Sequence, residues 1–165
     1  MLKAITDSIV EICNELNKND VQYLIVGGIA VALHGYFRWS YTSDGKAAEK
    51  YALDIWYNPN YENYFNLLNA LENLGQEVSK FKNEKSPNPK SSFFKFGLPT
   101  LTLDLLPSLN TLRKFSDSFK NREIITVNSI EISLIHFDDL IKEKESNSRP
   151  KDLDDIKKLN EIRNK

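Results

Sequence analysis

The feature that most constrains the fold of this chain is a glycine pair placed directly after an apolar run. Residues 21–26 form the run, Gly27 and Gly28 follow it, and residues 29–34 continue with helical character. A short run rich in Tyr, Ile and Val predicts a buried strand. Glycine at the following turn lets a ligand approach the backbone N–H groups of a helix start. Taken alone, the pair fits a tight turn without a ligand equally well.

The remaining hydrophobic pattern predicts helices and strands in alternation. Apolar positions recur at helical spacing in four segments, and helices are expected over 3–18, 61–74, 137–144 and 153–162. Short apolar runs predict a strand and two hairpins, over 51–57, 93–96 with 101–106, and 124–127 with 130–134. Two polar segments, 39–50 and 80–90, are expected to be surface loops, the second of them mobile.

Length and composition indicate an ordinary globular protein. A chain of 165 residues is expected to form a single domain over 1–165, and its net charge of −1 indicates no general nucleic-acid affinity. The single cysteine, Cys13, excludes an intrachain disulfide and a cysteine-based zinc site. No apolar run approaches the ~20 residues that span a membrane. The beginning of the chain does not resemble a signal peptide, so a cytoplasmic location without membrane contact is expected.

Acidic residues interrupt two of the predicted strands. Asp54 stands between Leu53 and Ile55, and Asp104 lies in a similar apolar run. Because side chains alternate along a strand, positions 52 and 54 share one face. A carboxylate in such a strand is costly unless it meets water, a partner or a cation. Converging carboxylates predict a magnesium site, whereas the alternative is a solvated residue at a strand edge.

A basic cluster near the C-terminus forms the third group of candidate residues. Lys144, Arg149 and Lys151 lie close together in the sequence, and Arg38 follows the helix after the glycine pair. Guanidinium and ammonium groups bind phosphate oxygens. The alternative interpretation is that the cluster caps a helix and covers a solvated face, since proline is favoured near a helix start and Pro150 precedes the predicted helix.

At these residues the chain resembles the nucleotidyltransferase-fold superfamily, in particular small bacterial proteins related to the abortive-infection toxin and minimal nucleotidyltransferase groups. The resemblance extends from about residue 20 to 160, over positions 26–31, 34–36, 38, 53–57, 102–105, 139–141, 144, 149–152 and 155–156. It implies an α/β (α+β type) fold, in which a polymerase-β-like mixed sheet is flanked by helices. It also implies that Gly27 and Gly28 bind the triphosphate of an NTP, with Mg²⁺ or Mn²⁺ as cofactor.

The resemblance implies an Asp-x-Asp pair and a third acid, and this sequence departs from that pattern at one position. Asp54 corresponds to the second acid of the pair and Asp104 to the third, but position 52 is Ala52. Asp44 and Glu49, in the extra loop before the strand, lack the strand position of the missing acid. Ala52 is therefore either an engineered catalytic knock-out or the mark of a natural degenerate member.

Three functions remain open at this stage. The first is metal-dependent transfer of an NMP from an NTP to an RNA or protein hydroxyl, inactive in this chain because of Ala52 and serving as one half of a toxin–antitoxin pair. Asp54 and Asp104 would bind the metal, and Arg38, Lys144, Arg149 and Lys151 would contact phosphate. The second is a nucleotide- or partner-binding module of the same fold, with an antitoxin as one partner. The third is a plain α/β domain whose acids are structural.

Overall fold

A computed structural model of the protein describes residues 2–38, 50–111 and 113–165. The predicted loop over 39–50, with Asp44 and Glu49, lies outside the described residues except for Lys50.

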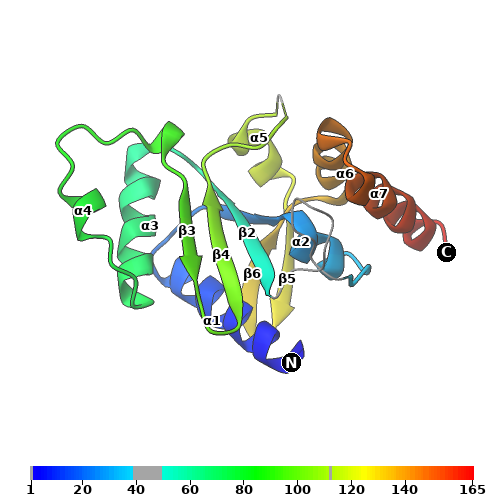
Figure 1. The fold of residues 1–165 in the computed structure, drawn as a ribbon, viewed down its shortest axis with the longest axis horizontal. Coiled ribbons are helices and arrows are strands. Elements are labelled where there is room, and N and C mark those ends of the chain that lie inside the picture. The colour runs from blue at the N-terminus through cyan, green and yellow to red at the C-terminus, as the bar shows by residue number, and fades with distance from the viewer. Residues whose placement is uncertain (1, 39–49, 112) are drawn as a thin grey trace.

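A mixed sheet forms the centre of the structure (Figure 1). Its strand order is β3-β4-β2-β1-β6-β5. The strands are β1 (Tyr23–Val26), β2 (Tyr51–Tyr57), β3 (Phe94–Gly97), β4 (Leu101–Leu106), β5 (Glu123–Val127) and β6 (Ile130–Leu134). The predicted hairpins are confirmed, since β3 pairs antiparallel with β4 and β5 with β6. The sheet is mixed because β2 is parallel to β4, and β1 is parallel to β6 but antiparallel to β2.

Helices flank this sheet. They are α1 (Leu2–Lys18), α2 (Gly27–Leu33), α3 (Tyr61–Asn73), α4 (Ser79–Lys82), α5 (Phe115–Lys120), α6 (Phe137–Asn147) and α7 (Pro150–Arg163), with a 3₁₀ turn η1 (Pro89–Ser91). Figure 1 shows α6 and α7 together beyond α2, at the opposite end of the molecule from α3 and α4. Among the described residues, no helix is both long and apolar enough to cross a membrane.

Three local predictions differ from the structure. The segment 80–90, expected to be an irregular loop, contains most of α4 and of η1, which are too short to produce a clear helical pattern. The short helix α5 was not predicted for the same reason. The last helix begins at Pro150 rather than at residue 153, because proline is compatible with the first helical position and Asp152 accepts hydrogen bonds from Arg149.

The centre of the sheet brings the predicted acids together. Leu53 and Ile55 of β2 are fully buried, whereas Ala52 and Asp54 on the opposite face are half-buried. The parallel pairing of β2 with β4 places Asp54 opposite Asp104. The apolar side chains of one face therefore anchor the strand, and the carboxylates face a cavity on the other.

We expect Leu53→Ala to lower the free energy of unfolding by about 2–5 kcal/mol, because it leaves a void at the sheet centre. Leu153→Ala is the matched control, since Leu153 is 56% exposed on α7 and its truncation should change stability by less than about 0.5 kcal/mol. Urea unfolding followed by circular dichroism measures both. Equal losses in the two variants would contradict the assigned position of β2.

Candidate active site

A cavity of about 160 Å³ lies where β2, the start of α2 and the α6–α7 pair meet. Its lining contains every residue predicted from the sequence to bind or catalyse except Asp104, which lies beside it through its pairing with Asp54. The lining residues are Val26, Gly27, Gly28, Arg38, Ala52, Asp54, Leu106, Leu109, Glu143, Lys144, Arg149 and Lys151. Segments far apart in the sequence thus form one site.

Gly27 is required at the turn by two separate constraints. Its φ of +69° lies in the left-handed region that favours glycine. A Cβ atom at this position would lie 2.2 Å from Oδ2 of Asp54, which is well inside contact distance. At Gly28 an added Cβ would lie 3.6 Å from Nη2 of Arg38, an ordinary contact. The glycine turn therefore lets the Asp54 carboxylate lie directly against the backbone at the start of α2.

Asp54 and Asp104 form a close pair of like charges. Burial and the neighbouring Asp104 carboxylate raise the pKa of Asp54 to about 7, against the opposing effect of Lys144. Oδ1 of Asp104 is buried and has no hydrogen-bond partner among the described residues. Both observations fit a site for a cation, which would lower the energy of two ionised carboxylates held together.

The donor set fits a single hard cation better than a pair. Within the described residues, no group of three or more acidic, histidine or cysteine side chains is placed to hold a metal ion. Glu143 lines the same cavity, but it does not complete such a group. Mg²⁺ is commonly held by one or two carboxylates together with water and substrate phosphate oxygens. Asp54 and Asp104 could hold one ion in this way.

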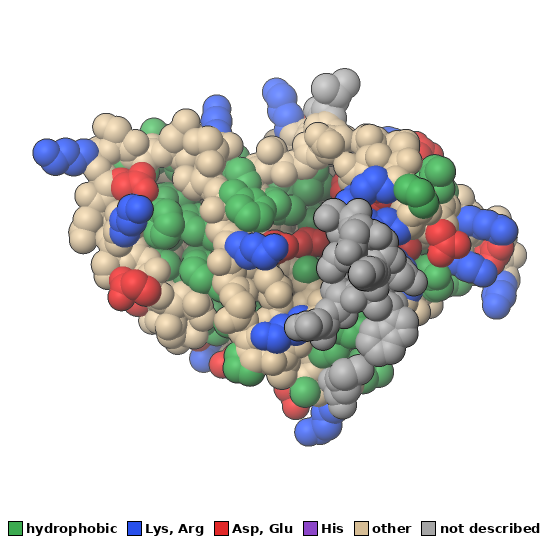
Figure 2. All heavy atoms as spheres, in the orientation of Figure 1, with side chains coloured by type: hydrophobic (Ala, Val, Ile, Leu, Met, Phe, Trp, Pro, Cys, Tyr) green, Lys and Arg blue, Asp and Glu red, His purple; other side chains and the backbone are tan. Residues whose placement is uncertain are grey.

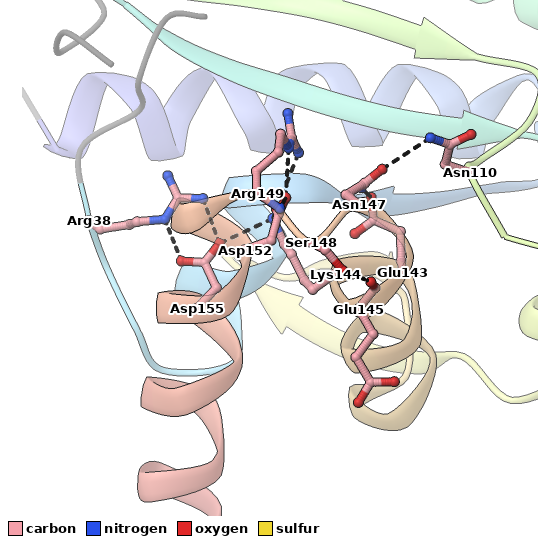
Figure 3. Close-up of polar contacts among 10 residues, drawn as sticks. All are labelled: Arg38, Asn110, Glu143, Lys144, Glu145, Asn147, Ser148, Arg149, Asp152 and Asp155. Carbon is pink, nitrogen blue, oxygen red and sulfur yellow. Dashed lines mark hydrogen bonds and ion pairs between the residues drawn. The ribbon is translucent and has the colours of Figure 1, made fainter. Parts of the chain in front are cut away.

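A buried ion-pair network fixes the basic residues of the cavity (Figure 3). The guanidinium of Arg38 donates to both carboxylate oxygens of Asp155, at 2.6 and 2.7 Å. Lys144 Nζ lies 3.3 Å from Asp152 Oδ1 and 3.1 Å from Asp155 Oδ2. Arg149 Nε donates to Asp152 Oδ2 at 2.6 Å. The two aspartates are fully buried, so three cations from different segments are held by one helix, α7.

The sequence left open whether the basic cluster caps a helix or lines a candidate binding site, and in the structure it does both. Asp152 caps α7 by accepting from the backbone N–H of Arg149, and it also binds the side chains of Arg149 and Lys144. Burial alone would raise the pKa of Asp152, but the hydrogen bond from Arg149 and the charge of Lys144 lower it below its ordinary value. Lys144 is 2% exposed, so a ligand could contact this side chain only where it borders the cavity.

Lys151 is the cation best placed to respond to an anion. It makes no ion pair with any described residue, and it lines the cavity. Burial, followed by the positive charges of Arg149 and Arg38, lowers the pKa of Lys151. A phosphate group bound in the cavity would offset this repulsion.

The sequence analysis gave no role in the site to Asp152 and Asp155, although both belong to the motifs of the resemblance, and it did not single out Glu143. Glu143 lines the cavity, and burial raises its pKa. Asp152 and Asp155 do not line the cavity, but they form ion pairs with its basic side chains. The available signal was helical spacing. Glu143 lies three residues after the buried Leu140, and Asp155 lies four before the buried Leu159. Charged residues on an inward helix face require buried partners.

Comparisons with known proteins agree with this geometry at the level of the fold. No protein-family model and no curated protein matches the chain. A crystal structure of an antigenic nucleotidyltransferase-like protein from Paracoccidioides brasiliensis is similar over 93% of this chain and 74% of that chain, with a TM-score of 0.51 and 14% sequence identity. This chain has a nucleotidyltransferase-like fold. The predicted mixed sheet flanked by helices is therefore confirmed.

We expect Gly27→Ala to destabilise the nucleotidyltransferase-like fold more than Gly75→Ala does. Both glycines have positive φ, so each alanine carries a backbone cost of about 1–2 kcal/mol. A Cβ at Gly75 meets nothing within 4 Å, whereas one at Gly27 displaces Asp54. Urea unfolding compares the variants, and adding Asp54→Ala to Gly27→Ala should recover part of the difference. Equal destabilisation by the two single substitutions would show that the Asp54 contact is unimportant.

Asp54 also predicts a pH dependence of stability. Its folded-state pKa of about 7 exceeds the ordinary value of 3.8, so its protonated form is favoured by folding. The resulting stabilisation is complete below about pH 4 and is lost as pH rises through about 7. Asp54→Asn should therefore gain stability relative to the parent chain between about pH 4.5 and pH 8. Asp117→Asn, at an exposed position, is the control. A difference in stability between Asp54→Asn and the parent chain that does not change with pH would refute the raised pKa of Asp54.

Proposed function

We propose that this chain belongs to a metal-dependent nucleotidyltransferase lineage that moves an NMP from an NTP to a hydroxyl group of RNA or protein. One observation carries the proposal: the glycine turn, the Asp54–Asp104 pair and the basic residues of α6–α7 meet at one cavity of a nucleotidyltransferase-like fold. The resemblance to abortive-infection proteins extends the proposal to a toxin role with an antitoxin partner.

The residues of the cavity divide the task of holding the NTP. Gly28 lines the cavity and leaves room for a phosphate oxygen beside Arg38, whereas the space at Gly27 is filled by the Asp54 carboxylate. Lys151 and the half-exposed Arg149 neutralise phosphate charge. Asp152 and Asp155 position Arg149, Arg38 and Lys144, so these side chains lose little freedom when the ligand binds.

Asp54 and Asp104 are the residues that would hold the metal ion. When bound, such an ion supplies Lewis-acid activation of the α-phosphate and neutralises the leaving pyrophosphate. Ala52 shares the cavity face of β2 with Asp54 and supplies no carboxylate. We propose that this position is where an acid completes the site in active members, and that the present chain is inactive for transfer.

A second candidate is a binding module that holds a nucleotide or a protein partner without turnover. The observation in its favour is that the described residues contain no set of three metal-binding side chains. Such a module retains the cations and the glycine turn, and it predicts NTP binding that is unaffected by the residue at position 52.

Ala52→Asp is expected to raise transfer of label from α-labelled NTP, with Mg²⁺ or Mn²⁺, on the order of 100-fold or more. The physical reason is that a third carboxylate on the same strand face as Asp54 completes the charge of the metal site. Total cellular RNA and total protein serve as acceptors. Ala52→Asn is the matched control, because it adds a side chain of the same shape without the charge.

The two candidates give different results in this experiment. Transfer by Ala52→Asp but not by Ala52→Asn supports the nucleotidyltransferase proposal. Tight NTP binding in all three forms with background transfer in each would favour the binding module. Absence of both NTP binding and transfer in all forms would reject the transferase and the nucleotide-binding module. A protein that is also monomeric and captures no partner would reject the binding module altogether.

A further inference from the structure

A second cavity lies beside the candidate active site and is larger, at about 520 Å³. It is formed by the end of β2, the segment after β4, the beginning of α5 and Lys90 of η1. Leu109 lines both cavities, so the two are adjacent. We refer to the second cavity as the α5 groove.

The position of the α5 groove follows from strand geometry. Trp56 lines the groove and lies two residues after Asp54 on β2, so the two side chains share a strand face. Two residues of strand correspond to roughly 7 Å. Leu106, the parallel partner of Trp56, lines the first cavity. The groove therefore begins roughly 7 Å along the strand from Asp54, one of the two carboxylates proposed to hold the metal ion.

The α5 groove is basic. Its lining includes Lys90, Arg113 and Lys114 and contains no aspartate or glutamate among the described residues. Arg113 is bound to Asp139 at 3.0 Å, whereas Lys90 and Lys114 make no ion pair within the described part of the chain. Figure 2 shows basic side chains projecting from the upper edge of the face, in the region where Figure 1 places α5. Two lysines are thus available to an anionic ligand beside the site.

The wall of the α5 groove also contains an unpaired hydrogen-bond donor. Trp56 is 2% exposed and packs edge-to-face against Phe115, with ring centroids 5.3 Å apart. Its Nε1–H is buried and has no acceptor among the described residues. Buried donors are normally paired, so an oxygen of a bound ligand would complete this group.

Resting on the proposed transfer function, we propose that the α5 groove holds the acceptor, and that this acceptor is the 3′ end of a single-stranded RNA. Regularly spaced phosphates match a basic groove without acidic residues, whereas a protein side-chain hydroxyl requires no such charge. In the step served, the RNA 3′ oxygen forms a bond to the α-phosphorus of the NTP. The bond from that phosphorus to the β-bridging oxygen breaks, pyrophosphate leaves, and the hydroxyl proton passes to water.

The test is binding of RNA rather than catalysis. A 5′-fluorescein-labelled single-stranded RNA of about twelve nucleotides is titrated with protein in EDTA, and fluorescence anisotropy is recorded at several salt concentrations. Lys90→Glu/Lys114→Glu should weaken binding at least ~10-fold and lower the slope of log K against log salt by about 1.4, since ~0.7 is lost per phosphate contact. Lys18→Glu/Lys157→Glu makes the same change in net charge outside the groove and should have less than about a twofold effect.

A third variant tests the unpaired donor. Trp56→Phe keeps an aromatic ring in the groove wall but removes the N–H group. It should weaken RNA binding several-fold at every salt concentration while leaving the salt slope unchanged. Circular dichroism and thermal unfolding establish that each variant is folded.

The outcomes separate this proposal from the one on which it rests. Equal weakening by the two double variants, or no RNA binding by the parent chain, would overturn the RNA groove even where NTP binding persists. Transfer by Ala52→Asp to protein alone, unaffected by Lys90→Glu/Lys114→Glu, would overturn it in favour of a protein acceptor. RNA binding that depends on the groove, without NTP binding or transfer by any position-52 variant, would reject the transferase function and the acceptor role together.

Discussion

The close approach of two carboxylates at the centre of the sheet governs the arrangement around it. Asp54 and Asp104 occupy one register position of the parallel β2–β4 pair, and burial together with the second charge raises the pKa of Asp54. The cost of ionising both is met by protonation of one of them or by nearby positive charge. The described residues supply this only partly, because Lys144, whose charge lowers the pKa of Asp54, is itself bound to Asp152 and Asp155. Protonation of Asp54 relieves the remaining repulsion, and the cation of the proposed function would do the same.

The α6–α7 pair holds the basic side chains of the cavity in place. Asp152 and Asp155 are on one face of α7, three residues apart, and both are fully buried. They bind Arg38 from the segment after α2, Lys144 from α6 and Arg149 at the start of α7. Removing Asp155 would break the buried ion pairs with Arg38 and Lys144, which is far more costly than losing an exposed ion pair. The network therefore links the orientation of the C-terminal helices to the shape of the smaller cavity.

Two cavities with different chemistry meet at Leu109. The smaller contains the carboxylates and the glycine turn, and the larger is basic without acidic residues in its described lining. This separation suits a reaction with two substrates, one bound through a metal-associated triphosphate and the other through a polyanionic chain. Local basic charge of this kind is compatible with a net charge of −1 for the whole chain.

The sequence alone determined the long helices, the strands and most of the residues that line the first cavity. Periodicity located the long helices and all six strands to within a few residues, because each carries its own apolar pattern. The glycine pair, Asp54 and Asp104 stood out because their residue types are unusual in apolar strands. Only the tertiary structure decided that β2 pairs with β4 in a register opposing the acids, and that Asp155 binds Arg38 across 117 positions of chain. Short elements such as α5, and contacts between distant segments, leave no local pattern; the α5 groove exists only when β2, β4 and α5 are folded together.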